Sequence, residues 1–65
     1  MPTLRELREE QFLTQEELHA LAGVGRTTII RIEAGQPGRY RPSSIKKLAK
    51  ALKVKPQEID LPPRA

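Results

Sequence analysis

A chain of 65 residues is enough for one small domain, and a domain of this size buries only about 60% of the surface that its unfolded chain exposes. It contains no cysteine and a single histidine, which excludes disulfides and thiolate or histidine-built metal sites, and we expect no cofactor. The formal net charge is +4, no run approaches the roughly 20 apolar residues of a membrane helix, and the first residues do not resemble a signal peptide, so we expect a cytoplasmic protein.

Every predicted element is a helix, because no stretch alternates apolar and polar residues over the length of a strand. The first helix begins after Thr3, whose spacing to Glu6 is that of a capping box, and it ends near Gln11. Phe12 and Leu13 are then expected to return the chain to the core.

A second capping box, Thr14 with Glu17, predicts the start of a second helix. This helix is expected to end at Gly23, in a position that favours a residue with left-handed backbone. Three apolar residues of this helix are expected to face inward: Leu18, Leu21 and Ala22.

A third helix follows after only two residues, Val24 and Gly25, and runs from about residue 26 to 34 before Gly35. Gly25 stands where a serine or threonine cap is usual, which weakens the start of this helix slightly. Two helices joined by so short a turn must cross at a steep angle, which is the helix-turn-helix arrangement. The apolar residues with the spacing needed to hold the two helices together are Leu18, Val24, Ile29 and Ile32.

Residues 36–42 contain prolines and a glycine and predict an exposed loop. Ser43 is expected to cap a fourth helix that ends at Lys53, and Lys55 and Pro56 open a short fifth helix. The inward residues of the fourth helix are predicted to be Ile45, Leu48, Ala49 and Leu52, and Ile59 and Leu61 are expected to form the apolar side of the fifth. We therefore expect an all-α domain of five helices over residues 1–61, followed by a short proline-rich tail over residues 62–65.

The third predicted helix has two faces when its residues are placed 100° apart. Ile29 and Ile32 point to one side. The opposite side and its flanks carry two arginines, two hydroxyls and an isoleucine: Arg26, Thr27, Thr28, Ile30 and Arg31. Arginine pairs with guanine, hydroxyls serve several base edges, and an apolar tip can contact the thymine methyl group. This side therefore predicts a surface that reads bases in the major groove of DNA, with packing of Ile30 against the fourth helix as the alternative.

The positive charge is concentrated in the middle of the chain. Residues 23–55 carry nine basic side chains against one acidic side chain, which gives a net charge of +8. Residues 1–22 have a net charge of −3 and residues 56–65 a net charge of −1. Such asymmetry favours a polyanion bound on one face, although the lysines alone fit a solvated helix surface equally well.

The chain resembles a known family in a series of segments. These are LR at 7–8, LTQEEL at 13–18, AGVGRTTI at 22–29, RIEAG at 31–35 and LAKALKV at 48–54. In this order and spacing they resemble the Cro/phage-repressor (XRE-type) helix-turn-helix family over about residues 3–60. The resemblance implies a lambda-repressor-like fold and a small transcriptional regulator that binds double-stranded DNA, with repression favoured.

The resemblance also implies roles for individual residues. Base contacts are expected from Arg26, Thr27 and Arg31, and, from its exposed position, Ile30. Phosphate contacts are expected from Gln15, Thr28, Arg39, Tyr40, Arg41, Ser43 and Ser44. Arg8 and Glu33 match a partly buried ion pair that ties the first helix to the third. The family commonly binds two half-sites as a dimer, and Ile59 and Leu61 are candidates for a homodimer surface.

Three positions depart from the family pattern. His19 stands where alanine is usual, and its larger side chain is expected to turn outward or to form a hydrogen bond rather than to act as a pH switch. Gly25 replaces a capping residue, and Lys53 replaces a glycine. These departures affect the fine geometry and leave the expected fold unchanged.

The alternatives to DNA binding are catalysis and the binding of another protein. Catalysis is not expected, because the carboxylate pairs Glu9–Glu10 and Glu16–Glu17 are adjacent in sequence and do not face each other on a helix. No small-molecule ligand is expected either, since there is no room for an effector domain. The remaining alternative is a protein-binding module, such as an antitoxin, and the salt dependence of binding would distinguish it from a DNA-binding protein.

Overall fold

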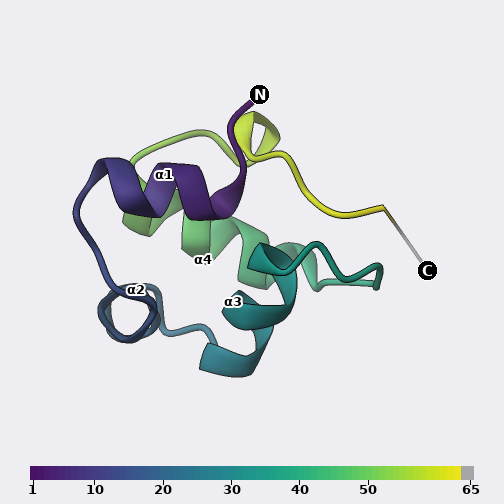
Figure 1. Cartoon of the computed structure of the whole chain (residues 1–65), viewed down its shortest axis with the longest axis horizontal. Helices are drawn as coiled ribbons and strands as arrows, with labels where there is room; N and C mark the ends of the chain where they lie inside the picture. The colour runs from purple at the N-terminus through teal and green to yellow at the C-terminus, as the bar shows by residue number, and fades with distance from the viewer. Residues whose placement is uncertain (64–65) are drawn as a thin grey trace.

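The computed structural model describes residues 1–63, and its helices cross one another around a shared core (Figure 1). The four α-helices are α1 (Leu4–Glu10), α2 (Gln15–Ala22), α3 (Arg26–Glu33) and α4 (Pro42–Leu52). Within residues 1–63 the only strand-like pairing is a single parallel bridge between Thr3 and Asp60. The all-helical class is therefore confirmed, and the last part of the expected tail, residues 64–65, lies outside the described residues.

The predicted fifth helix is only one 3-10 turn, Pro56–Glu58 (η1). Ile59 already has extended backbone, and the N–H of Asp60 donates to the carbonyl of Pro2 at 2.8 Å. This hydrogen bond pairs the segment after η1 with the start of the chain, so the segment does not continue as a helix. Pro62 also disfavours helical backbone at the residue before it.

The starts of α1 and α2 are the two predicted capping boxes. The Thr3 hydroxyl accepts the N–H of Glu6 at 3.2 Å, and the Thr14 hydroxyl accepts the N–H of Glu17 at 3.0 Å. In return, each glutamate side chain accepts the N–H of its threonine. Two of the otherwise unpaired N–H groups at each helix start are thereby satisfied.

The turn between α1 and α2 corrects the prediction for Phe12. This residue has a φ of 57°, and its side chain is 92% exposed. The N–H of the next residue, Leu13, donates back to the carbonyl of Arg8 at 3.2 Å, which closes the turn tightly. Left-handed backbone at Phe12 turns its side chain to solvent, so only Leu13 packs against the core.

The core is formed by apolar residues from all four helices, the helix-turn-helix turn and the segment after η1. Its members are Leu4, Leu7, Leu18, Val24, Ile29, Ile32, Ile45, Leu48, Ala49, Leu52 and Ile59. Leu21 was predicted to be inward but is 64% exposed. The inner face of α2 carries Leu18 and Ala22 against the core, and the last turn of the helix leaves Leu21 uncovered.

The start of α4 differs from the prediction by two residues. Arg41 occupies the cap position and Pro42 is the first helical residue, so Ser43 lies inside the first turn and does not cap. Proline suits this position because its fixed φ is helical and its missing N–H would have no partner within the helix. At the other end Lys53 has a φ of 59° and takes the left-handed place that a glycine usually fills.

The turn between α2 and α3 is short and braced by a side chain. Gly23 ends α2 with the predicted left-handed backbone, at a φ of 69°. His19 is half-buried, and its Nδ1–H donates to the carbonyl of Val24 at 2.6 Å. The imidazole therefore ties the end of α2 to the turn, in place of the small side chain that the family pattern has there.

Candidate nucleic-acid interface

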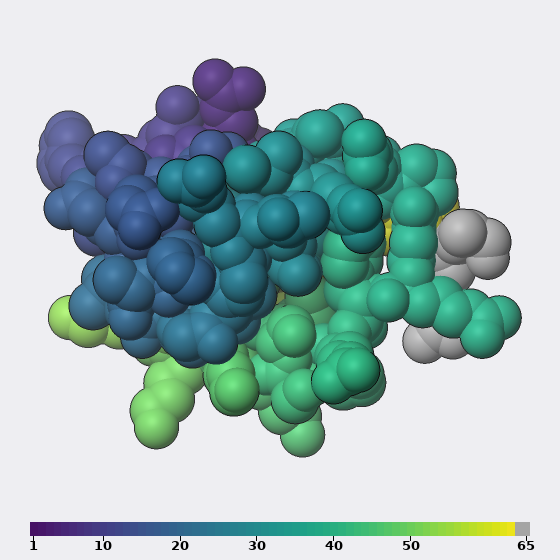
Figure 2. All heavy atoms as spheres, turned by 90° about the horizontal axis from the view of Figure 1, so that it is seen from below, coloured from purple at the N-terminus to yellow at the C-terminus, as the bar shows by residue number. Residues whose placement is uncertain are grey.

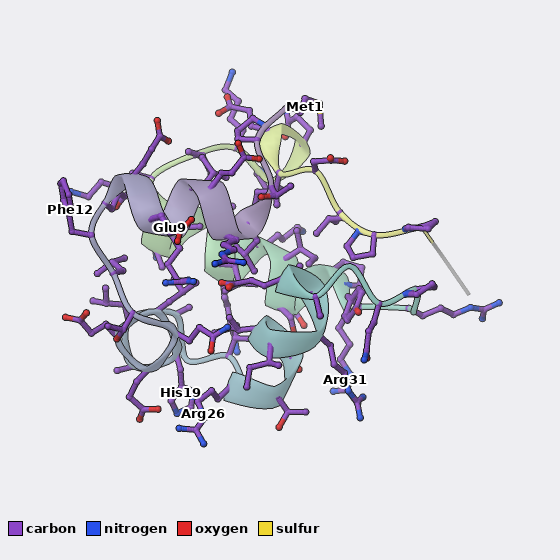
Figure 3. The ribbon with its side chains drawn as sticks, in the orientation of Figure 1. Met1, Glu9, Phe12, His19, Arg26 and Arg31 are labelled. Carbon is purple, nitrogen blue, oxygen red and sulfur yellow. The ribbon has the colours of Figure 1, made fainter. Side chains whose placement is uncertain are left out.

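The two faces of α3 differ as the sequence predicts. Ile29 is completely buried and Ile32 is 4% exposed, whereas Thr27 and Arg31 are exposed. Ile30 is 43% exposed and does not belong to the core. In Figure 3, Arg26 and Arg31 both extend from the lower side of α3.

This lower side is a continuous surface of the molecule. Figure 2 views it face-on, with α2 in blue, α3 in blue-teal and the loop before α4 in teal-green lying next to one another. The first residues of α2, the exposed face of α3 and the loop are thus available together to one large partner. The two helices α2 and α3 remain side by side on this surface because they are in contact and only a short turn joins them.

A polar groove joins α3 to the loop. It has a volume of about 310 Å³ and contains three arginines but no carboxylate. The groove is lined by Thr28, Arg31, Gln36, Pro37, Gly38, Arg39, Tyr40, Arg41 and Ser44. It therefore gathers one predicted base-contacting residue with five of the seven predicted phosphate-contacting residues. Ser43 and Gln15 lie outside it.

The arginines of this surface differ in their charge partners. Arg26 Nη1 lies 3.1 Å from Glu16 Oε2, so this arginine already has a carboxylate partner. Within the described part of the chain, none of Arg31, Arg39 and Arg41 forms a salt bridge. The groove consequently holds three positive charges that are available to an anion.

Gln15, the first residue of α2, connects α2 to α3. Its side-chain N–H donates to Glu33 Oε1 at 3.1 Å, and it lines a shallow hollow together with Ile30. Gln15 therefore braces α3 while standing at the edge of the exposed face of that helix.

The ion pair expected between Arg8 and Glu33 is present. Arg8 Nε and Nη2 donate to the two carboxylate oxygens of Glu33 at 2.7 and 2.9 Å, and Nη1 donates to the carbonyl of Leu13 at 2.7 Å. The two side chains are 12% and 5% exposed. One guanidinium thereby joins α1, α3 and the turn before α2.

The pair holds both groups in their charged forms. Burial, the largest influence on Glu33, raises the pKa of its carboxyl, but the hydrogen bonds from Arg8 and Gln15 and the charge of Arg8 together outweigh it, so this pKa lies below its ordinary value of 4.5. The hydrogen bond to Glu33 raises the pKa of Arg8. Charge and hydrogen bonding are thus mutually satisfied at a site with little access to water.

The loop before α4 is held by its own contacts. The hydroxyl of Tyr40 donates to the carbonyl of Gln36 at 2.7 Å, which closes the loop on itself. The N–H of Gly38 donates to the carbonyl of Pro63 at 3.2 Å, which ties the loop to the segment after η1. Arg39 and Arg41 therefore stand on a loop with defined geometry.

One contact of this surface was missed by sequence reasoning. The sequence alone gives Glu16 no partner, and it predicts Arg26 only as a DNA contact. They are ten residues apart and become partners only because the turn at Gly23 folds α3 back against α2. A helical spacing rule cannot find such a pair, since it connects two helices.

Two short helices that pack through Leu18, Val24 and Ile29 across a tight turn, with a basic exposed face on the second helix, define a helix-turn-helix domain. The chain belongs to the Cro/phage-repressor (XRE-type) helix-turn-helix family. Residues 4–59 match the family model described as Helix-turn-helix.

Three curated relatives resemble the chain over 51 residues each. The HTH-type transcriptional repressor RghR of Bacillus subtilis is 51% identical over 78% of this chain, and the uncharacterized HTH-type transcriptional regulator RghRB of the same organism is 47% identical over 78%. The chain spans only 38% and 37% of these two proteins. An uncharacterized HTH-type transcriptional regulator of Methanothermobacter thermautotrophicus is 51% identical over 75% of the chain and 70% of that protein.

No solved structure matches the chain significantly. Among residues 1–63, no helix has the length and apolar character required to cross a membrane.

Proposed function

We propose that this chain binds double-stranded DNA sequence-specifically through the major groove and acts as a small transcriptional regulator, with repression the favoured outcome. The observation that carries the proposal is the groove between α3 and the loop, in which three arginines lie without a carboxylate. The relatives named as a transcriptional repressor and as transcriptional regulators support the same role. Such a role implies a cytoplasmic protein that is associated with the nucleoid when it is bound to DNA.

The exposed residues of α3 read the bases and the surrounding elements hold the backbone. The base contacts are assigned to Arg26, Thr27, Ile30 and Arg31. The phosphate contacts are assigned to Gln15, Thr28, Arg39, Tyr40, Arg41, Ser43 and Ser44. This division follows from position: α3 is the element that enters the groove, and the loop and the start of α2 flank it.

Two substitutions test the two kinds of contact. Arg31→Ala should lower affinity for the preferred site by about 1–3 kcal/mol and relax the base preference at one position. Arg39→Ala should weaken binding to all sequences alike and reduce the salt slope by about 1. Selection of bound sites from random DNA, followed by titrations at several salt concentrations, measures both effects.

The two variants also provide each other's control, since each removes one arginine from the same groove. Unchanged affinity of both variants for the parent's site would show that the proposed surface is wrong. A parent protein whose binding does not respond to salt would favour the alternative, a protein-binding module with an antitoxin-like role.

We also propose that two copies bind one DNA site, on half-sites about 34–36 Å apart. Of the two residues expected at the dimer surface, Ile59 is 3% exposed and belongs to the core, so it cannot contribute. Leu61 is 37% exposed and borders an apolar hollow of about 700 Å³ next to Tyr40 and Pro42. A second copy seated there lies beside the loop that grips the phosphates.

Sedimentation tests the dimer. With a duplex that carries two half-sites, the parent should give two chains per duplex, and Leu61→Asp should lower the cooperativity and leave the affinity for a single half-site unchanged. A monomer at high micromolar concentration, both free and on this duplex, would contradict the dimer.

A further inference from the structure

The ion pair between Glu16 and Arg26 joins the two helices of the helix-turn-helix at the edge of the proposed DNA surface. Glu16 is the second residue of α2, and Arg26 is the first residue of α3. Their side chains are 66% and 61% exposed, and the Nη1 to Oε2 distance is 3.1 Å. An ion pair this exposed contributes little to the stability of the fold. Its distinctive property is its place at the edge of the proposed DNA surface.

We infer that Glu16 is a positioning residue that sets the base specificity of Arg26. The inference rests on the proposed function, because it concerns how one proposed base contact is made. Glu16 does not touch DNA in this role. It holds the guanidinium toward the floor of the major groove and away from the neighbouring phosphates.

The first argument is the number of donors on the guanidinium. Arginine has five N–H groups in a planar fork, and a bidentate contact with guanine uses two of them. Within residues 1–63 the hydrogen bond from Nη1 to Glu16 is the only one that the guanidinium of Arg26 makes. The guanidinium can therefore keep Glu16 and present a free edge to the O6 and N7 atoms of guanine at the same time.

The second argument is charge. Phosphates attract any arginine regardless of sequence, and this attraction supplies most of the affinity for non-specific DNA. Glu16 compensates the charge of Arg26, whereas no carboxylate lines the groove that contains Arg31, Arg39 and Arg41. Arg26 is thus the arginine of this surface with the least attraction to phosphate, and its contribution depends more on the base in front of it.

The experiment compares Glu16→Gln with the parent on the selected site, on the same site with the guanine opposite Arg26 replaced, and on random duplex. Glu16→Gln should bind random duplex about 2–3-fold more tightly with a steeper salt slope, and should lose on the order of tenfold in discrimination for that guanine. Glu16→Asp keeps the charge but is one methylene shorter. It should lose discrimination without gaining affinity for random duplex.

Glu10→Gln is the matched control. Glu10 is exposed and is the last residue of α1, and this helix lies on the opposite side of the molecule from Arg26 (Figures 1 and 3). Glu10→Gln changes the net charge by the same amount as Glu16→Gln, and it should leave the discrimination for the guanine opposite Arg26 unchanged. Thermal unfolding followed by circular dichroism verifies that all variants are folded.

A double substitution separates positioning from a general charge effect. In an Arg26→Ala background, Glu16→Gln should have no further effect on discrimination at that base pair. The inference is overturned if Glu16→Gln leaves discrimination unchanged in the parent, or if its effect persists without Arg26. If the parent protein binds DNA sequence-specifically and either of these results is obtained, only this inference is contradicted. If the parent protein has no sequence preference, the proposed function is contradicted as well.

Discussion

Replacing Arg8 with alanine is expected to lower the free energy of unfolding by about 3–5 kcal/mol. The substitution removes three hydrogen bonds and leaves the carboxylate of Glu33, which is 5% exposed, without its cationic partner. The free-energy cost of an unpaired charge at such a site is far larger than the net stabilisation that the ion pair provides. For a domain of this size the loss corresponds to a decrease in Tm on the order of 20 °C, measured by thermal unfolding followed by circular dichroism.

Two further variants distinguish the buried pair from charge in general. Arg5 on the same helix pairs with Glu9 at 3.6 Å, but both side chains are more than half exposed. Arg5→Ala should therefore cost less than about 1 kcal/mol. The double variant Arg8→Met with Glu33→Leu should recover much of the stability lost in Arg8→Ala, because no charge remains buried. Equal losses for Arg8→Ala and Arg5→Ala would contradict the structural role of the buried pair.

Replacing Ile29 with alanine is expected to cost about 2–5 kcal/mol. Ile29 is completely buried on the inner face of α3, in the same core as Leu18 of α2. The substitution leaves a cavity beneath the helix proposed to read DNA. Chemical denaturation should report a lower midpoint, and DNA binding at a fixed temperature should fall with the folded fraction. Ile29→Val, which removes one methyl group, should cost only about 0.5–1.5 kcal/mol.

The adjacent residue is the matched control. Ile30 is 43% exposed on the opposite face of α3, so Ile30→Ala should change stability by less than about 0.5 kcal/mol. If its tip meets a thymine methyl group, the same variant should lose base preference at one position. Ile29→Ala should therefore lower stability, whereas Ile30→Ala should change base preference. A large loss of stability in Ile30→Ala would contradict the two-faced description of α3.

Local rules were sufficient for most of the helix boundaries. The capping boxes at Thr3 and Thr14 and the left-handed Gly23 were predicted correctly because each depends on residues at most three positions apart. The division of α3 into an apolar and a polar face was also predictable, since helical periodicity alone orients its side chains. The same periodicity identified the inward residues of α4.

The tertiary structure decided the features that depend on what covers a residue. Phe12 and Leu21 are apolar and were expected inside, but within residues 1–63 no other element covers these two side chains. Ile59 was expected at a dimer surface, and it is buried because Asp60 pairs with the start of the chain and holds this segment against the core.

The residues of the proposed DNA surface also depend partly on local sequence and partly on tertiary packing. The sequence by itself determined that arginines and hydroxyls would occupy the outer face of α3, because their order along one helix is enough to place them. Only the tertiary structure decided that Arg31 shares a groove with Arg39 and Arg41, and that Arg26 meets Glu16. These contacts join residues from different elements, and their distances are set by how α2, α3 and the loop pack on the core.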